Sequence, residues 1–308
     1  MSAGIIFQQM CIIFLLILTG YFLSKKKLVT ENAGRDLSAI VVNVCNPALV
    51  ITSVLDSKTD ITGRKVLIWA VIVFAMYAVL ILLAKVLPLL LRVERKERNY
   101  YSLLALFGNI GFIGIPVVSA VLGPQYLIYV VIVSIYFNIL AYTYGEYLVV
   151  KGQEGSQAHF DPKRLLNVGT ISGIIAILIF ALHPRLPVVL TDTVSYMGRA
   201  TTFVSMVVIG ISLAHQPLKK IFGDKRMYLF SILRYFVVAA IFGLVMKQFI
   251  ADEMMCATMT LMVAMPAANL PLMLAEEKGL DGSVLSRGIV LSTVLSLVTI
   301  PLTALVIS

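Results

Sequence analysis

The residues of this sequence that are best suited to chemistry are amides, glycines and prolines set inside long apolar stretches. One group is Gly108-Asn109-Ile110-Gly111-Phe112-Ile113-Gly114-Ile115-Pro116, within an apolar segment from about 101 to 121. Glycine lowers helix propensity, and proline has no N–H with which to continue a helix. A helix broken here begins its second half with unpaired N–H groups and a partial positive charge, which can hold a carboxylate. This pattern predicts anion binding around Asn109, Gly111, Gly114 and Pro116.

A second interrupted stretch lies about half of the 308-residue chain further on. Ala264-Met265-Pro266-Ala267-Ala268-Asn269-Leu270-Pro271 divides the apolar run from about 254 to 275. Broken backbone at membrane depth is tolerated only where it is buried in protein or lines a cavity, and paired interrupted spans indicate the binding site of a secondary transporter. We therefore predict that Pro266, Asn269 and Pro271 belong to the same site. Two kinks that serve only helix packing are the alternative.

Further polar residues sit inside apolar segments and are candidates for the same site. Asn43 and Asn46-Pro47 lie within 36–55, and Asn138 and Tyr142 share a helix face within 125–150. An asparagine in hydrocarbon is costly unless it is paired, so these amides should face the protein interior. Ser205 is a weaker candidate in the polar part of 192–214. Cavity lining and interhelical hydrogen bonding remain equally open for these side chains.

Two arginines lie about two turns inside predicted spans. Arg199 is near one end of 192–214, and Arg234 is near one end of 226–249. Charged residues inside a membrane are functional candidates by default. Both are close enough to an interface to extend their charged ends into water, which is the expectation for each. Arg199 is kept as a lower-ranked site candidate.

The composition is that of an integral membrane protein. The chain is 59% hydrophobic and 13% charged with a mean hydropathy of +0.95, whereas a soluble domain carries about 25% charged residues. Apolar periodicity predicts an all-α fold of ten transmembrane helices, in which the fourth and ninth are broken and cross. The predicted spans are 4–23, 36–55, 66–91, 101–121, 125–150, 165–182, 192–214, 226–249, 254–275 and 284–307.

The ten predicted spans fall into two similar sets of five, which predicts an internal repeat. Five is an odd number, so the second set enters the membrane from the opposite face and the repeat is inverted. The expected units are a first repeat at 1–150, a flexible cytoplasmic linker at 151–163 and a second repeat at 164–308. Most lysines and arginines lie in the loops after odd-numbered spans. The positive-inside rule therefore places both termini outside the plasma membrane.

Other chemistries find little support in the sequence. The three histidines lie in loops or at span ends, without the spacing of metal ligands, so no metal site is predicted. Neither a Ser/His/Asp arrangement nor paired intramembrane aspartates are present, so an enzyme is not expected. The formal charge of +9 is distributed over short loops, which argues against a nucleic-acid partner. The expected partners are the lipid bilayer and a small solute.

At these motifs the chain resembles the auxin efflux carrier family, which includes the plant PIN-formed auxin carriers and bacterial carriers assigned to malate, malonate or related acids. The resemblance covers essentially the whole chain. Its motifs are the run from Gly108 to Pro116 with Gly123 after it, Asn46-Pro47-Ala48-Leu49, Gly210-Ile211-Ser212-Leu213 and the run from Met265 to Pro271. It implies the ten-span inverted-repeat fold of the bile-acid symporters, elevator-like alternating access, anion binding beside Asn109 and, often, a homodimer.

Two departures from relatives limit what the resemblance implies. The long cytoplasmic loop of many plant members is absent, so their phosphorylation control does not carry over. The bile-acid symporters coordinate sodium partly through acidic or amide side chains near the crossover, whereas here the ninth-span break offers Asn269 and no carboxylate. No cofactor is expected, and coupling to sodium or to protons stays open.

The function expected from the sequence is secondary transport of small organic acid anions, mono- or dicarboxylates, with the substrate bound at the midplane crossover. A membrane ligand sensor that uses the same fold without net transport is the alternative from another class. A channel and an intramembrane enzyme are less favoured rivals.

Overall fold

The computed structural model describes residues 3–55, 62–151, 162–182, 184, 186–215 and 223–307, and these are almost entirely helical. The α-helices are α1 (Ala3–Lys25), α2 (Glu31–Ile40), α3 (Asn46–Leu55), α4 (Gly63–Leu90), α5 (Arg98–Leu106), α6 (Ile115–Val121), α7 (Leu127–Leu140), α8 (Glu146–Val150), α9 (Val168–Leu182), α10 (Val188–His215), α12 (Lys225–Ile232), α13 (Val238–Phe249), α14 (Glu253–Ala264), α15 (Leu270–Glu277) and α16 (Ser283–Ile307).

Short helical segments of other types link several of these helices. The π-helical turns are η1 (Val41–Cys45), η2 (Ile110–Gly114), η4 (Ala141–Gly145) and η6 (Leu233–Val237), and the 3-10 turns are η3 (Pro124–Tyr126) and η5 (Pro162–Leu165). Each π turn continues directly into an α-helix, so η1 joins α2 to α3 and η6 joins α12 to α13. Within the described ranges, β pairing is limited to one isolated antiparallel bridge between Gly108 and Ala267.

The chain is an all-α membrane protein. Among the described residues, seven helical runs are long and apolar enough to cross a bilayer, and Ile110–Val121, Val168–Leu182 and Glu253–Ala264 are shorter apolar helices. Each of the ten spans predicted from the sequence overlaps a helix or a continuous helical run, and the linker predicted at 151–163 falls largely outside the described residues.

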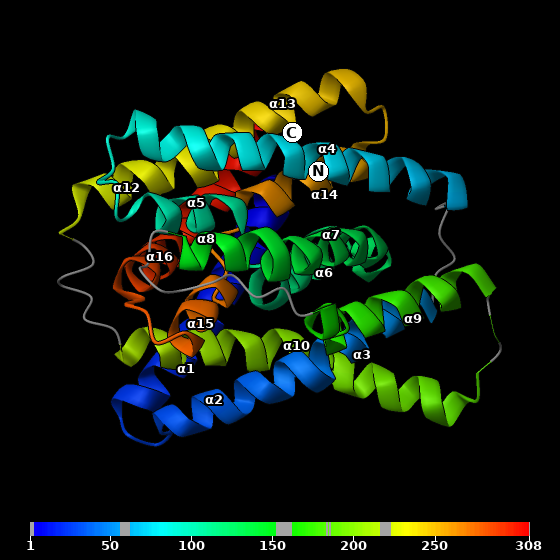
Figure 1. The fold of residues 1–308 in the computed structure, drawn as a ribbon. Coiled ribbons are helices and arrows are strands. Elements are labelled where there is room, and N and C mark those ends of the chain that lie inside the picture. Colours follow the sequence, from blue (N-terminus) through cyan, green and yellow to red (C-terminus); the bar gives the residue numbers. More distant parts are fainter. Residues whose placement is uncertain are drawn as a thin grey trace.

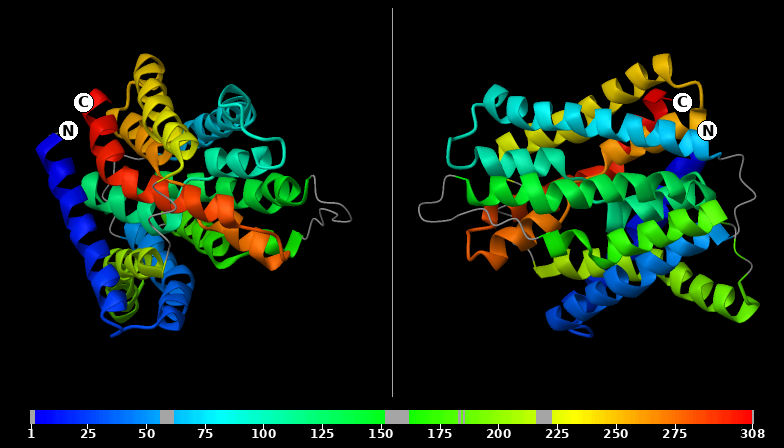
Figure 2. Two further views of the ribbon diagram at one scale, coloured as in Figure 1. Left: turned by 90° about the vertical axis from the view of Figure 1, so that its left-hand side faces the viewer. Right: turned by 45° about the vertical axis from the view of Figure 1, so that its right-hand side comes forward.

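The helices form two groups, here called the panel and the body. The panel consists of α1, α2, α3, α9 and α10, which pack chiefly against one another. In Figure 1 α2, α3, α9 and α10 lie together in the lower part, and α1 rises from there behind the body toward the N label. The body comprises α4 to α8 and α12 to α16, with α4, α12 and α13 at its outer edge. The panel meets the body through α7 against α9 and α1 against α16. The start of α1 and the end of α16 lie close together in all three views (Figures 1 and 2).

The panel is held by unusually close helix contacts. A Cβ atom placed on Gly210 of α10 would lie 2.0 Å from the carbonyl oxygen of Ile17, and one on Gly20 of α1 would lie 2.2 Å from the carbonyl oxygen of Val207. Only glycine permits this approach, because any side chain would collide with backbone. Nearer the start of α10, Gly198 meets the backbone of Leu49 in α3 in the same way.

Candidate functional site

Two interrupted helices cross at the centre of the body and are joined there by backbone hydrogen bonds. In the first, α5 is followed by a short extended segment and then by η2 and α6. In the second, α14 is followed by a short extended segment and then by α15. The Asn109 N–H donates to the carbonyl oxygen of Pro266 at 2.7 Å, and the Ala268 N–H donates to that of Phe107 at 2.9 Å. Ser292 of α16 accepts a third bond from the Ala267 N–H at 3.1 Å. The polar backbone groups of the interrupted segments thus find hydrogen-bond partners within the protein, as backbone groups buried away from water must.

The breaks occur where glycine, asparagine and proline interrupt the apolar runs, with one shift from the sequence expectation. Pro116 is not at the break itself but in the first turn of α6, where a missing N–H costs little. The first helix instead stops at Leu106, and Asn109 caps the second part by accepting a bond from the Phe112 N–H at 3.1 Å. Asn109 is 4% exposed and is therefore also a structural residue.

The starts of the two second half-helices present backbone donors. Among the described residues, the Gly111 N–H has no hydrogen-bond acceptor, and neither do the N–H groups of Asn269 and Leu270. All three residues line one cavity. The positive ends of two helices therefore meet the same space, and an anion there would complete their hydrogen bonding.

The carboxyl ends of the two first half-helices, α5 and α14, are bound by Arg234. This residue of η6 is 1% exposed. Its guanidinium donates to the carbonyl oxygens of Ala105, at the end of α5, and of Val263, at the end of α14. It also lies over the Tyr235 ring at 5.2 Å, and the Tyr235 hydroxyl donates to the Leu104 carbonyl at 2.7 Å. The expectation that Arg234 extends into water is wrong, because its charge is satisfied by two helix carboxyl ends inside the protein.

The cavity beside the crossover has a volume of about 350 Å3 and lies between the panel and the body. The panel side contributes Asn43, Asn46 and Pro47, and the start of α9 contributes Asn167. Asn46 lies directly beside Gly111, since a Cβ placed on Gly111 would lie 3.4 Å from Asn46 Nδ2. The Asn46 Oδ1 is buried and has no partner among the described residues. The predicted residues that line the cavity are Asn43, Asn46, Pro47, Asn109, Gly111, Asn138, Tyr142 and Asn269.

The other predicted site residues lie outside the cavity lining. Gly114 packs against Met262, and the Pro266 carbonyl accepts the crossover bond from Asn109. Pro116 and Pro271 are buried in the first turns of α6 and α15. Two candidates on α10 are also elsewhere: Arg199 is exposed, and Ser205 is fully buried and donates to the Thr202 carbonyl.

Each π-helical turn carries a residue of this region. Asn43 lies in η1, Gly111 in η2, Tyr142 in η4 and Arg234 in η6. The wider turn shows directly in bonds that span five residues, such as the Ile115 N–H to the Ile110 carbonyl. Prolines two residues after η1 and η2 remove N–H groups that would close a normal turn, so the sequence offers a signal there. For η4 and η6 the sequence contains no such signal. Single π turns occur often at functional sites.

A cluster of ion pairs is centred on Glu146, the first residue of α8. Glu146 is 3% exposed and accepts a bond from Arg164 Nη1 at 2.8 Å, with Lys278 Nζ 3.8 Å from the same oxygen. The cluster joins α8, η5 and the end of α15. Glu146 is therefore a buried carboxylate that is paired with two basic residues.

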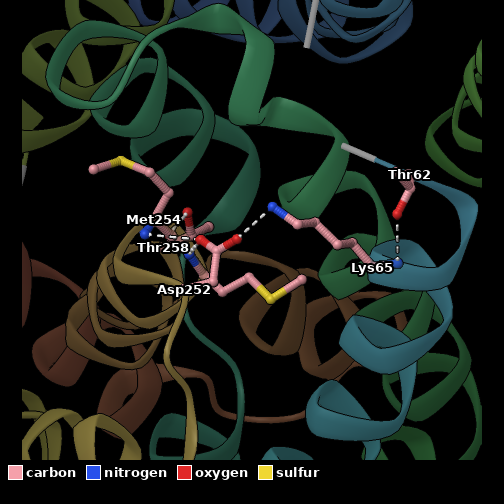
Figure 3. Close-up of polar contacts among 6 residues, drawn as sticks. Thr62, Lys65, Asp252, Met254 and Thr258 are labelled. Carbon is pink, nitrogen blue, oxygen red and sulfur yellow. Dashed lines mark hydrogen bonds and ion pairs between the residues drawn. The ribbon is translucent and has the colours of Figure 1, made fainter. Parts of the chain in front are cut away.

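Another ion pair joins the amino-terminal ends of α4 and α14 (Figure 3). Asp252 caps α14 by accepting bonds from the N–H groups of Met254 and Met255, and its other oxygen lies 2.8 Å from Lys65 Nζ. In Figure 3 Lys65 reaches from the first turn of α4, which is itself capped by Thr62. No group of three metal-ligating side chains occurs in the described part of the chain.

Comparison with known proteins identifies transporters. The profile of the family described as membrane transport protein matches residues 5–164 and 162–304. An uncharacterized transporter of Methanocaldococcus jannaschii is 25% identical over 300 residues, covering 94% of this chain and 95% of the relative. An uncharacterized transporter of Methanothermobacter thermautotrophicus is 26% identical over 299 residues, covering 96% of each.

Proposed function

Since the chain belongs to the membrane transport protein family, which includes the PIN-like auxin efflux carriers, we propose that it is a secondary carrier for small organic acid anions. The observation that supports this most strongly is the cavity at the crossover. Unpaired N–H groups of Gly111, Asn269 and Leu270 face it from two helix starts, and the amides of Asn46 and Asn138 surround it. These are donors for a carboxylate in a largely apolar space.

The charge of the cavity favours a monocarboxylate over a dicarboxylate. None of the described residues that line it is a lysine, arginine or histidine, so the positive potential of this lining comes from helix ends and amides. Each helix start is equivalent to about half an elementary charge, so two of them balance about one negative charge. A second carboxylate would stay unpaired at a large desolvation cost. The substrate proposed here therefore has one carboxylate and an apolar body that fits about 350 Å3.

Alternating access is proposed to arise from movement of the body against the panel. Asn43 and Asn46 come from the panel, whereas Asn109, Gly111, Asn138 and Asn269 come from the body, so the substrate would be held at the boundary of the two groups. An elevator-like shift fits this division. It accords with the proposed inverted repeat of ten spans, in which residues 1–150 form the first repeat and residues 164–308 form the second. The protein is proposed to lie in the plasma membrane with both termini outside. A homodimer is part of the proposal through family resemblance alone.

The proposed coupling does not use sodium at the crossover. A sodium ion there would need oxygen ligands, and the carbonyls of Ala105 and Val263 already accept bonds from Arg234. The guanidinium supplies permanently the positive charge that a bound cation would bring. Export of a monovalent anion can draw on the membrane potential, worth about 2.3 kcal/mol per charge per 100 mV.

The test combines binding and flux. The purified protein is heated with single monocarboxylates and dicarboxylates, with and without sodium, and a ligand of the folded state raises the unfolding temperature. The informative variant is Asn109→Asp, which keeps the oxygen that caps Phe112 and adds a negative charge beside the cavity. Like charges in contact cost several kcal/mol, so binding should weaken at least about a hundredfold. Asn32→Asp, on the exposed side of α2, is the matched control.

Counterflow in proteoliposomes separates the carrier from its alternatives. A carrier preloaded with unlabelled acid accumulates labelled acid transiently, and the effect saturates. Binding without any flux would favour the sensor, and flux without counterflow would favour a channel. Absence of binding by every monocarboxylate, together with binding of a cationic solute, would overturn the assignment of the cavity.

A further inference from the structure

A second cavity lies at the boundary between the panel and the body, where α1 and α10 meet α16. It has a volume of about 210 Å3 and is lined by α1, α10 and α16, through Phe14, Leu18, Tyr21, Leu213, Val294 and Leu297 among others. The surface that it exposes is entirely apolar. Thr293 also lines the groove, but the surface that faces the cavity carries no exposed polar atom, so the groove suits a hydrocarbon chain better than a polar solute.

Basic residues follow directly on the helix that forms most of this groove. Lys25 is the last residue of α1, Lys26 and Lys27 follow it in a turn, and all three are exposed. Position 25 is one turn beyond Tyr21, and Lys25 Nζ lies 5.6 Å from the centre of the Tyr21 ring. Tyr21 therefore has its ring in the groove and a cation above it. The chain changes direction at Lys27, whose φ of 58° is in the left-handed region. Because of this turn, the three lysines stay close to the end of α1.

From this arrangement we propose that the groove with its lysines is a binding site for an anionic phospholipid. One acyl chain lies along α1 between α10 and α16, and the phosphate is held by the three lysines. Two features match such a lipid. The apolar groove accommodates the acyl chain, and the lysines accommodate the phosphate, since the residues from Tyr21 to Val29 include no acidic side chain. Basic residues beside a membrane span attract anionic lipid headgroups.

The position of the site gives the lipid a mechanical role. α1 and α10 belong to the panel and α16 to the body, so a chain in the groove touches both groups. The site is separate from the crossover cavity, and its proposal does not depend on the nature of the transported solute.

The experiment is native mass spectrometry of the full chain released from nanodiscs of phosphatidylcholine with or without phosphatidylglycerol. The wild-type protein should retain phosphatidylglycerol in preference to phosphatidylcholine. The triple variant K25Q/K26Q/K27Q should bind it roughly a hundredfold more weakly, since each basic residue near an anionic lipid contributes about a fivefold factor. The matched control is R92Q/R95Q/K96Q, which removes the same charge from the loop between α4 and α5, away from the groove.

A second variant tests the chain rather than the headgroup. Leu297→Trp fills the groove from α16 and should reduce retention of phosphatidylglycerol with all lysines in place; Val294→Phe repeats the test with a smaller addition in case the first variant does not fold. Equal losses in the α1 triple variant and the control triple variant would show unspecific surface attraction and overturn the proposal. Unchanged retention in the filled-groove variants, or equal retention of phosphatidylcholine, would overturn it as well.

Discussion

Replacing Arg234 by methionine removes a side chain that joins the carboxyl ends of both interrupted helices. Methionine is of similar length and fits an apolar site, so the change deletes hydrogen bonds and charge with little loss of volume. The carbonyl oxygens of Ala105 and Val263 then lose their donor in a place that water does not reach. The ring of Tyr235 also loses the cation above it.

The magnitude follows from two opposing effects. Each buried acceptor left without a partner costs about 1–3 kcal/mol, which gives about 2–6 kcal/mol for the two carbonyls. Removing a buried charge returns part of this, because a well-packed apolar residue avoids the desolvation penalty of the ion. We expect the unpaired carbonyls to dominate, since the guanidinium charge is compensated by its bonds to both of them, and we predict a net loss of about 2–4 kcal/mol in the free energy of unfolding.

The assay is thermal unfolding of the purified protein in one detergent, followed by transport in liposomes. Arg234→Lys should fall between wild type and Arg234→Met, because an ammonium group keeps the charge but lacks the fork that reaches two carbonyls together. The exposed Arg199→Met is the control and should change stability by less than about 0.5 kcal/mol. If Arg234→Met unfolds and transports like the wild type, Arg234 does not organise the crossover and the reasoning fails.

Three further predictions concern the framework around the site. Asp252→Ala removes the cap of α14 and the pair with Lys65, and should cost about 1 kcal/mol in thermal unfolding, whereas Asp252→Asn keeps the cap and should cost only a few tenths. Partial burial opposes ionisation of Asp252, but bonds from Lys65 and two backbone N–H groups outweigh it and hold the pKa of Asp252 below its usual value. The stabilisation by the ionised carboxylate is therefore lost as the pH falls below about 4, and wild type and Asp252→Asn should become equally stable there. A difference in stability that stays constant with pH would contradict this. Gly210→Ala drives a methyl group into backbone and should cost about 1–3 kcal/mol, against no loss for Gly63→Ala at an open position; equal melting temperatures would refute the close contact. Glu146→Ala should destabilise by about 1–2 kcal/mol, less than for a fully buried pair because its partners are partly exposed, and salt should not abolish the difference.

Much of the fold follows from local sequence signals. Long apolar runs gave the helices and their approximate ends, and the glycine, asparagine and proline clusters located both interruptions to within a few residues. Such signals are local because helix propensity and proline chemistry act within one or two turns. The amides at 43, 46, 109, 138 and 269 were placed in one region on the same grounds, and they do line one cavity.

What the sequence could not predict depends on contacts between distant segments. Arg234 lies far along the chain from Ala105, and its role exists only once α5 and α14 end beside it. Near the end of a span, an arginine that reaches water and one that reaches carbonyls have the same local sequence. The buried Glu146 and the capping role of Asn109 escaped prediction for the same reason, because each depends on which groups the tertiary fold brings within hydrogen-bond distance.

The glycine contact between α1 and α10 also has a consequence for biosynthesis. Gly20 and Gly210 are separated by about 190 residues, and ribosomes add about 5–20 residues per second. The first helix therefore waits roughly 10–40 s in the bilayer before its partner is made. During that interval the face of α1 around Gly20 is without its partner α10. Until α10 emerges the panel cannot close, so a chain stalled in its second half would display an unfilled helix-binding face that membrane quality control can recognise.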